Sequence, residues 1–312
     1  MPVATYEQYC KMMDTAYANH YAFPAINVFD MESINGVLAG LAEAHSDGII
    51  QMSFGGAQHA SGTLKDMYLG ALALANHVHL MAEKYNIFVA LHTDHCQNDK
   101  VDTFMIPLIE ETERRRAAGL PNLFNSHMFD GSALPHKENV KIAKGLLERC
   151  AKSQLVLEVE AGVVGGEEDG VIGAGELADP QQCKTIADLG ITMLAAGIGN
   201  IHGKYPANWK GLNFEVLSAI HEACSGKPLV LHGGTGIPAE MVRKAISLGV
   251  AKVNVNTECQ LAFAAATRKY IEEGKDEQGK GYDPRKLLAP GYQAIKDTVK
   301  EKMELFGSIG KA

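Results

Sequence analysis

Short apolar runs rich in Val, Ile and Leu alternate along the chain with longer segments in which apolar residues recur every three or four positions. The short runs have the length and residue preferences of buried β-strands, and the longer segments have the period of helices. Helices are expected at residues 179–189, which begin with Asp-Pro, and at residues 238–248, which begin with Pro and stop before Gly249. We expect strands at residues 23–28, 49–54, 87–93, 123–129, 155–161, 192–199, 228–233 and 252–257.

The alternation of strand and helix predicts an α/β fold with a parallel sheet. Eight such units in a chain of 312 residues fit a (β/α)8 TIM barrel, for which about 250 residues is typical. The extra length is assigned to an N-terminal extra helix at residues 6–18 and a C-terminal helical extension at residues 275–312. No linker divides the chain, so residues 1–312 are expected to form a single barrel domain. A doubly wound open sheet is the structural alternative.

Polar residues gather where each expected strand ends. Enzymes with this barrel place their chemistry at the carboxyl ends of the strands. These positions follow buried runs rather than turns, so the polarity of an ordinary surface does not explain them. The residues concerned are Asn27, Ser53, Asp94, His95, His127, Asp130, Glu158, Glu160, His202, His232, Asn254 and Asn256.

The 12 histidines divide by position. Those in helical segments or before the first strand are more often surface or satisfied core residues. Three imidazoles that converge from separate strands would form an open zinc site, with the fourth position left for substrate. Strand alternation alone does not identify the three ligands. In an ideal strand His92 shares a face with Asp94 while His95 points to the other face, so alternation would favour His92. The rule weakens at the end of a strand, where the chain is already turning. The candidates are His59, His92, His95, His127, His202 and His232.

Composition narrows the class of protein. Hydrophobic residues make up 46% and charged residues 21% of the chain, as in ordinary globular proteins. No apolar run is long enough to span a bilayer, and the N-terminus lacks the basic and apolar regions of a signal peptide, so we expect a cytoplasmic protein without membrane contact. A net charge of −8 without a basic block argues against nucleic-acid binding. The 6 cysteines form no CxxC pair and are expected to be reduced.

Nine stretches in chain order carry a family resemblance: "YAFPAINV", "GIIQMSFGGA", "ALHTDHC", "SHMFDGSA", "LEVEAGVVGGEEDGV", "GNIHGKY", "LVLHGGTGIP", "VNVNTE" and "YDPRK". Together they resemble the class II, metal-dependent fructose-bisphosphate aldolases. The resemblance implies a glycolytic lyase that reversibly cleaves fructose 1,6-bisphosphate into dihydroxyacetone phosphate and glyceraldehyde 3-phosphate. Relatives that act on tagatose 1,6-bisphosphate share most of these motifs, so a tagatose-bisphosphate or other ketose-phosphate aldolase is the alternative.

The resemblance also implies a role for individual residues. His95, His202 and His232 match the three ligands of a catalytic Zn²⁺, with Co²⁺ as an alternative metal and a monovalent cation as a further cofactor. Glu160 and Asp130 match acidic positions near a second metal position.

Two carboxylates match the residues that move protons in this family. Asp94 corresponds to the acid/base that acts on the C4 hydroxyl. Glu168, in the glycine-flanked "GGEEDG" segment, corresponds to the group that transfers a proton at the dihydroxyacetone-phosphate carbon. We expect this segment to be a flexible loop that closes over bound substrate.

Substrate-binding positions follow in the same way. The resemblance assigns the dihydroxyacetone-phosphate phosphate to Gly203, Gly233, Thr235, Asn254 and Thr257, with Asn256 nearby on the substrate and Asn27 and Ser53 on the carbonyl side. Arg285 matches an arginine that grips the far phosphate, commonly across a subunit interface, which implies a homodimer or homotetramer. Family members often read HGxYK after the second ligand; here Pro206 stands at the lysine position, and the nearby lysines are Lys204 and Lys210.

The residues suit this chemistry on physical grounds. Cleaving a carbon–carbon bond beside a ketone leaves a carbanion whose charge passes to the carbonyl oxygen, which needs a positive partner. A Schiff-base lysine is not indicated, because Lys227 and Lys252 stand at the starts of their expected strands. A Lewis-acid metal held by neutral imidazoles is the other solution.

Two other classes of protein stay open at this point. A metal-dependent hydrolase on the same barrel could use three histidines and an aspartate, but hydrolysis needs no proton donor such as "GGEEDG" supplies, and no HxH motif opens the first strand. A barrel that has lost catalysis and serves as a binding protein would not need Asp94 and Glu168.

Overall fold

Eight parallel strands close into a barrel in the order β1-β11-β10-β8-β5-β4-β3-β2. The structure is a computed structural model that describes residues 2–312, apart from the side chains of Glu168 and Val171. The barrel strands are β1 (Phe23–Asn27), β2 (Gly48–Ser53), β3 (Val89–Gln97), β4 (Ser126–Asp130), β5 (Val156–Ala161), β8 (Met193–Ala196), β10 (Leu229–Leu231) and β11 (Val250–Val255). Each overlaps a strand expected from the sequence, so the TIM-barrel prediction is confirmed and the open-sheet alternative is wrong.

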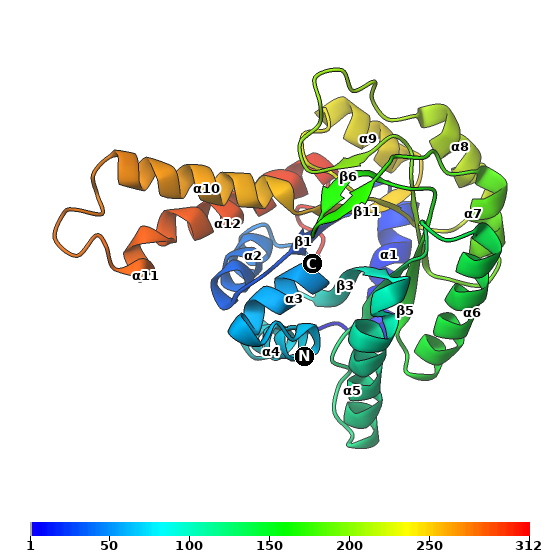
Figure 1. Ribbon diagram of the computed structural model, residues 1–312, viewed down its shortest axis with the longest axis horizontal. Coiled ribbons are helices and arrows are strands. Elements are labelled where there is room, and N and C mark those ends of the chain that lie inside the picture. The colour runs from blue at the N-terminus through cyan, green and yellow to red at the C-terminus, as the bar shows by residue number, and fades with distance from the viewer. Residues whose placement is uncertain (1) are drawn as a thin grey trace.

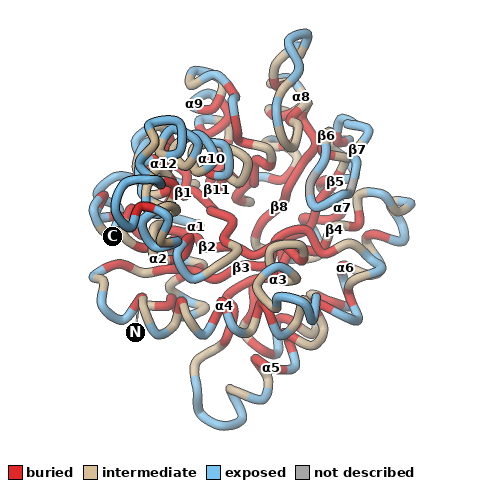
Figure 2. Tube along the Cα trace, turned by 60° about the vertical axis from the view of Figure 1, so that its left-hand side comes forward, coloured by how far each residue is buried: buried red, intermediate tan, exposed pale blue. Residues whose placement is uncertain are grey.

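Helices cover the outside of this barrel (Figure 1). They are α2 (Met31–Glu43), α4 (Met67–Ala82), α5 (Ile106–Ala117), α6 (His136–Lys152), α7 (Pro180–Ala187), α8 (Phe214–Ala223) and α9 (Ala239–Ser247). The strands are buried on both faces, and Figure 2 shows them as the buried centre of the molecule. Parallel strands enclosed in this way need apolar residues on both sides. This is why the sequence shows continuous apolar runs instead of strict alternation.

Helix α1 (Tyr6–Ala18) closes the amino-terminal end of the barrel, as the extra N-terminal helix expected from the sequence. Thr5 and Gln8 form a capping box at its start. Its buried residues Tyr9, Met13 and Ala16 pack in one cluster with the inward-facing side chains of the lower barrel. That end of the barrel is therefore filled, and a site is possible only at the opposite end.

The C-terminal extension forms a helical arm. Helix α10 (Thr257–Glu272) and helix α12 (Ala289–Phe306) run side by side, with the short α11 (Pro284–Leu287) at the far end. The arm projects away from the barrel in Figure 1. The C-terminal part of α12 returns to the barrel, where Val299, Met303 and Phe306 are buried in the outer core. The predicted helical extension is thus confirmed.

A small second sheet lies over the carboxyl end of the barrel. It contains β6 (Gly165–Glu168), β7 (Val171–Gly173) and β9 (Ile201–His202). β6 and β7 form a hairpin whose two turn residues, Asp169 and Gly170, have φ of 50° and 81°, the left-handed values of a type I′ turn. The segment expected to be a flexible loop thus contains a hairpin, with Asp-Gly at the turn and β6 paired with β9; its closure over bound substrate stays a prediction.

The carboxylate of Asp47, just before β2, supports a test of stability. Burial raises the pKa of Asp47 to about 6, although its Oδ1 accepts a hydrogen bond from the Phe88 N–H at 2.6 Å. A raised pKa means that this group favours folding while it is protonated, and that this contribution is lost as pH rises through about 6. Two pKa units correspond to at most about 3 kcal/mol. Asp47→Asn keeps the accepting oxygen and is expected to stabilise the fold at pH 7.5 by more than at pH 4, measured by urea unfolding.

The control is Asp14→Asn, which removes an exposed carboxylate on α1 and so corrects for the general effect of losing one acidic side chain. An Asp47→Asn variant that is equally stable relative to the parent at both pH values would contradict the assignment.

Candidate active site

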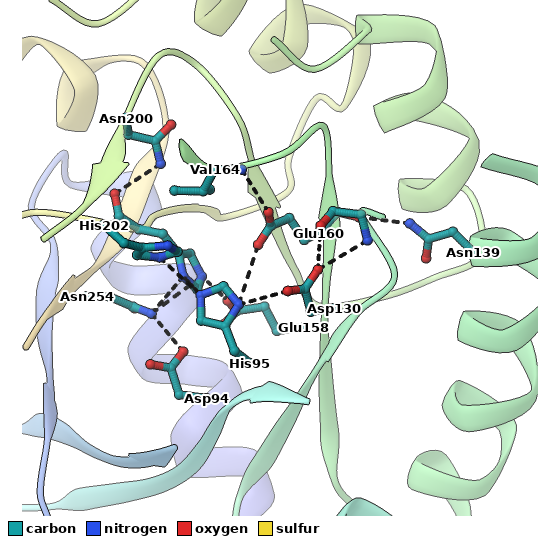
Figure 3. A network of polar contacts seen from close by, with 12 residues as sticks. Asp94, His95, Asp130, Asn139, Glu158, Glu160, Val164, Asn200, His202 and Asn254 are labelled. Carbon is teal, nitrogen blue, oxygen red and sulfur yellow. Dashed lines mark hydrogen bonds and ion pairs between the residues drawn. The ribbon is translucent and has the colours of Figure 1, made fainter. Parts of the chain in front are cut away.

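Three imidazole nitrogens meet at the carboxyl end of the barrel. His95 Nε2 lies 3.2 Å from His202 Nε2 and 2.8 Å from His232 Nδ1. The three rings come from β3, from β9 and from the residue after β10, and all stand edge to face. Figure 3 shows His95 and His202 of this cluster, with Asp94 next to His95. The structure thus brings together the three histidines that the sequence predicts as ligands.

The outward nitrogens of these rings explain what the cluster can bind. His95 Nδ1 faces Asp130 Oδ2 at 3.1 Å, and His232 Nε2 faces Glu158 Oε1 at 2.9 Å, so both outward nitrogens donate to carboxylates. The inward nitrogens, 2.8 Å apart, then present lone pairs to each other, and two acceptors at that distance repel unless a cation lies between them. In tetrahedral zinc sites two bound nitrogens lie about 3.3 Å apart. The residues present therefore fit a divalent metal.

The environment also favours the neutral imidazoles that a metal needs. Burial lowers the pKa of His202 and of His232 well below the ordinary value, and the neighbouring His95 lowers both further. At neutral pH both rings are therefore neutral, and each has one nitrogen that carries a lone pair. No such lone pair is available on a protonated ring.

A bulge in β3 decides which histidine of "LHTDH" reaches the cluster. The register between β3 and β4 shifts between Thr93 and Cys96, and His95 adopts φ of 39°. A left-handed backbone at a residue other than glycine costs of order 1–3 kcal/mol and is kept where surrounding contacts impose it. The bulge turns Asp94 and His95, which are consecutive, toward the same site. His92 instead lies deeper, fully buried, with Nδ1 on Ser126 Oγ at 2.7 Å.

Asp130 and Glu160 lie behind the His95 ring, on its Nδ1 side. With His95 they form a second group of close potential ligands, which shares His95 with the three-nitrogen cluster. Burial raises the pKa of Asp130, but hydrogen bonds from His95 and Ser132 outweigh this and hold it below the usual range. Burial raises the pKa of Glu160 well above its usual value, and the nearby Asp130 charge adds to the shift. The Asp130 and Glu160 carboxylates could therefore either orient the His95 ring or bind a second cation.

Asp94 is held by three amide side chains. Its Oδ2 accepts from Asn27 Nδ2 and from Gln51 Nε2, each at 2.9 Å, and its Oδ1 accepts from Asn254 Nδ2 at 3.1 Å. Burial raises the pKa of Asp94, yet nearby His95, His232 and the Asn27 hydrogen bond leave it below the ordinary value. Asp94 is therefore an oriented anion at neutral pH, as a proton acceptor must be. Asn254 Nδ2 also lies 3.2 Å from His232 Nδ1, which places Asp94 next to the cluster.

The predicted phosphate residues gather in one cavity. It has a volume of about 200 Å³ and opens beside His202. The amino terminus of α10 begins at Thr257 in this wall, and a helix start attracts anions. Gly233 has φ of 64°, and an added Cβ would lie 2.2 Å from the Ile201 carbonyl oxygen, so only glycine fits there. The predicted residues that line the cavity are Asn27, Gly203, Gly233, Thr235, Asn254, Asn256 and Thr257.

A larger cavity adjoins the first one. Its volume is about 350 Å³, and it is lined by His95, Asp130, Glu160, Asp169 and His202 among others. Two of these residues, Asp169 and His202, line both cavities. A substrate with two ends could therefore lie across the three-nitrogen cluster.

Some predicted residues lie elsewhere or outside the description. Arg285 is at the far end of the arm, where its side chain is 89% exposed and pairs with Asp283. The Glu168 side chain lies outside the described residues. Ser53 is buried beside Asp94 and caps α3 (Phe54–Ala60) through its Oγ. Lys204 and Lys210 line neither of the two cavities.

Two histidine candidates can be set aside in the described part of the chain. His59 is exposed on α3, against the ring of Phe29. His127 is fully buried in β4, where its Nδ1 contacts Thr93 Oγ1 at 2.8 Å, and burial lowers its pKa to about 3. Neither ring joins the three-nitrogen cluster.

Sequence reasoning missed two supporting residues. Gln51 is fully buried and holds both Asn27 and Asp94; a polar residue two positions before Ser53 in an apolar strand was the available signal. Tyr205 accepts from Ile201 N–H and donates to the Gly233 carbonyl at 2.8 Å, which ties β9 to the phosphate cavity. Tyr205 belongs to the "GNIHGKY" stretch, but sequence reasoning assigned it no role of its own, because both of its partners are main-chain groups.

The same motifs and geometry occur in known proteins. Residues 7–311 match the sequence profile of the family described as "Fructose-bisphosphate aldolase class-II". The chain belongs to this family. Metal dependence is general among class II aldolases, so the fit of the histidine cluster to a metal agrees with the family. In the described part of the chain, no helix is both long and apolar enough to cross a membrane.

Individual members of the class II aldolase family match over almost their whole length. Fructose-bisphosphate aldolase of Mycoplasma pneumoniae is 45% identical over 306 residues, which cover 97% of this chain and 98% of the relative. Fructose-bisphosphate aldolase of Mycobacterium leprae is 42% identical, with 100% and 99% covered. The crystal structure of fructose-bisphosphate aldolase from Campylobacter jejuni superposes with a TM-score of 0.88 at 30% identity, with 99% of this chain and 97% of that chain covered.

The turn of the β6–β7 hairpin of this aldolase is hydrogen-bonded to helix α3. Asp169 Oδ2 accepts from the Gly55 N–H of α3 at 3.0 Å, and a Cβ at Gly55 would lie 2.4 Å from the Asp169 carboxylate. One hydrogen bond of this kind contributes about 0.5–1.5 kcal/mol. Asp169→Gly, which keeps the positive φ, is therefore expected to speed amide exchange in residues 165–173 by roughly 2–10-fold, measured by hydrogen–deuterium exchange.

Asp169→Asn is the matched control, since it keeps both an accepting oxygen and tolerance of positive φ. Unchanged exchange in the Asp169→Gly hairpin would show that this contact does not fasten it.

Proposed function

We propose that this protein is a class II fructose-bisphosphate aldolase that binds Zn²⁺ through His95, His202 and His232. The observation that carries the proposal is the meeting of three lone-pair nitrogens beside an oriented, buried Asp94 at the edge of an anion-binding cavity. When bound, Zn²⁺ would act as a Lewis acid toward negative charge that develops on the substrate C2 oxygen. The substrate is a phosphorylated ketose.

The cavity beside α10 binds and orients the substrate. The main-chain N–H of Gly233, together with the hydroxyl groups of Thr235 and Thr257, suits the phosphate on the dihydroxyacetone side. Thr235 Oγ1 already accepts from the Glu258 N–H at 3.0 Å, which fixes its position against the helix start. A phosphate anchored there directs the sugar carbons toward His202 and Asp94.

Asp94 removes the proton of the C4 hydroxyl in the cleavage direction. The C4–O bond becomes a carbonyl as the C3–C4 bond breaks, and the electron pair of that bond passes to the C2 oxygen as an enediolate. The aldehyde product leaves with its phosphate. The amide donors on Asp94 keep its carboxylate aimed while the proton moves.

Glu168 delivers a proton to C3 of the enediolate and so completes dihydroxyacetone phosphate. The position of its neighbours supports this role: Glu167 and Asp169 line the phosphate cavity, and β6 pairs with β9, which carries His202. Closure of the hairpin against α3 would keep water from the enediolate.

The C4 epimers provide the test of substrate identity. Fructose and tagatose 1,6-bisphosphate differ in the direction of the hydroxyl group on which Asp94 acts. A coupled assay for triose phosphate is expected to give a higher kcat/KM for fructose 1,6-bisphosphate by at least about tenfold, which corresponds to about 1.4 kcal/mol. A preference for the tagatose epimer would make the alternative substrate correct. Release of inorganic phosphate without triose phosphate would instead indicate a hydrolase.

A second copy of the chain supplies Arg285 in this proposal, within a homodimer or homotetramer. Its exposed position on the projecting arm supports this, because the arm can reach a neighbouring barrel more readily than its own cavity. Arg285→Ala is expected to raise KM for the bisphosphate about 10–100-fold, as the loss of a charged contact worth about 1.5–3 kcal/mol implies. Kinetics and light scattering check this together; a monomeric parent enzyme with full activity would contradict it.

A further inference from the structure

A second layer of polar side chains lies inside the barrel, directly beneath the histidine cluster. Glu158 of β5 and Lys252 of β11 are both fully buried, and Lys252 Nζ donates to Glu158 Oε2 at 2.9 Å. The other oxygen, Glu158 Oε1, accepts from His232 Nε2 at 2.9 Å. His92 of β3 approaches Oε2 at 3.5 Å. Figure 3 shows Glu158 behind the ring of His95.

This ion pair is unexpected as a source of stability. Moving a carboxylate and an ammonium out of water costs several kcal/mol for each ion, and apolar residues of similar volume are often neutral or stabilising in their place. Barrels of this kind normally fill their interior with branched apolar side chains. The lower layer here follows that rule, with Ala25, Ile49 and Val156 buried there. A different reason is therefore needed for charges one layer above.

The geometry points to control of the His232 ring. A carboxylate has only acceptors, so Glu158 Oε1 requires the proton of His232 to be on Nε2. The lone pair is then on Nδ1, the nitrogen that faces His95 Nε2 at 2.8 Å. Carboxylates that accept from the outer nitrogen of a metal-binding histidine fix its tautomer and its orientation.

We propose that Glu158 and Lys252 are positioning residues for metal binding: Glu158 holds His232 in the Nε2–H tautomer, and Lys252 balances the charge of Glu158 inside the barrel. The inference rests on the proposed role of His232 as a metal ligand. It also gives a function to Lys252, the third residue of β11, which is not at the strand start as the sequence suggested. Its ammonium group is bound to Glu158 beneath the site, so it is an electrostatic partner and not a Schiff-base nucleophile.

Two double variants separate the accepting oxygen from the charges. Glu158→Leu/Lys252→Met removes both charges and the acceptor, while Glu158→Gln/Lys252→Met removes both charges but keeps an oxygen for His232. Zn²⁺ affinity of the full chain is measured by competition with a chromophoric chelator. The Leu/Met variant is expected to bind Zn²⁺ about 10–100-fold more weakly than the parent. The Gln/Met variant is expected to stay within about threefold of the parent, since its amide oxygen still accepts from Nε2.

The outcomes are distinguishable. A parent that fails to bind Zn²⁺ contradicts the proposed function. A parent that binds Zn²⁺ while the Leu/Met variant binds it equally well overturns the positioning role alone. Equal weakening in both double variants also overturns it, because packing of the ion pair would then matter and not the accepting oxygen.

A direct measurement on the parent covers the case in which the double variants do not fold. Nitrogen-15 NMR of the metal-free full chain reports the tautomer of each histidine, and His232→Asn assigns the signal. The Nε2–H tautomer is expected for His232 before any metal is added. A proton on Nδ1 of His232 in the folded, metal-free protein would overturn the inference.

Discussion

Replacing Asp94 by Ala is expected to lower kcat for bisphosphate cleavage by about 10²–10⁴-fold, the usual contribution of a positioned proton acceptor, and to leave the bound metal in place. Asp94 accepts hydrogen bonds from three amide side chains, whereas the proposed metal ligands are three histidines. The substitution therefore removes the proton acceptor and leaves all three metal ligands in place. The fold should survive, because the alanine side chain occupies less space at the top of the barrel. Steady-state kinetics together with metal analysis of the same preparation checks both halves of the expectation.

The exposed Asp102, which follows β3, provides the matched control: Asp102→Ala should keep full activity. A Asp94→Ala variant with parental kcat would show that another group takes the C4 proton. A variant that lost its metal as well as its activity would show instead that Asp94 supports the ligands, and the assignment of a proton-transfer role would fail.

Removing the metal is the second large effect. Treatment with a strong chelator is expected to reduce cleavage to less than about 1% of the untreated rate, because a Lewis acid contributes several kcal/mol of charge stabilisation. Addition of Zn²⁺ should restore the rate, and Co²⁺ serves as the comparison metal. His202→Ala should produce the same loss without chelator, since it removes one of three converging nitrogens. Metal analysis and the triose-phosphate assay measure these changes.

His202 is a suitable position because it is only partly buried and belongs to the small second sheet, so the barrel strands keep their packing. His59→Ala, at an exposed histidine outside the cluster, is the control and should retain both metal and activity. Full activity of the metal-free protein would refute the metal-dependent mechanism. Loss of activity in His202→Ala with the metal content unchanged would show that His202 contacts the substrate and is not a metal ligand.

Much of the fold could be predicted from the sequence because buried segments have a characteristic pattern of apolar residues. Parallel strands covered on both faces require apolar runs, and all eight expected strands are present in the barrel. Helix α1 has the predicted bounds, and in the structure Thr5 and Gln8 form the capping box at its start. The ends of the strands were less certain: β3 runs four residues beyond its expected end at residue 93, to Gln97.

The site was partly readable for a related reason. A polar residue at the end of a buried run has no role in the core, so such residues marked the carboxyl end of the barrel as the place for chemistry. The choice of His95, His202 and His232 came from the resemblance to a family, because periodicity favoured His92. The bulge between Thr93 and Cys96 explains why periodicity was misleading, since an inserted residue reverses the alternation.

The sequence by itself thus determined the number and order of the barrel strands, the end that carries the chemistry, and the side chains available there, because these depend on local patterns of burial. Only the tertiary structure decided which polar groups meet. Glu158 and Lys252 come from two strands and His232 follows a third, and no local pattern encodes their contacts. The same holds for Asp169, which fastens its hairpin to Gly55, 114 positions away in the chain. Contacts between distant segments depend on strand register and backbone geometry, and these are settled only when the whole barrel closes.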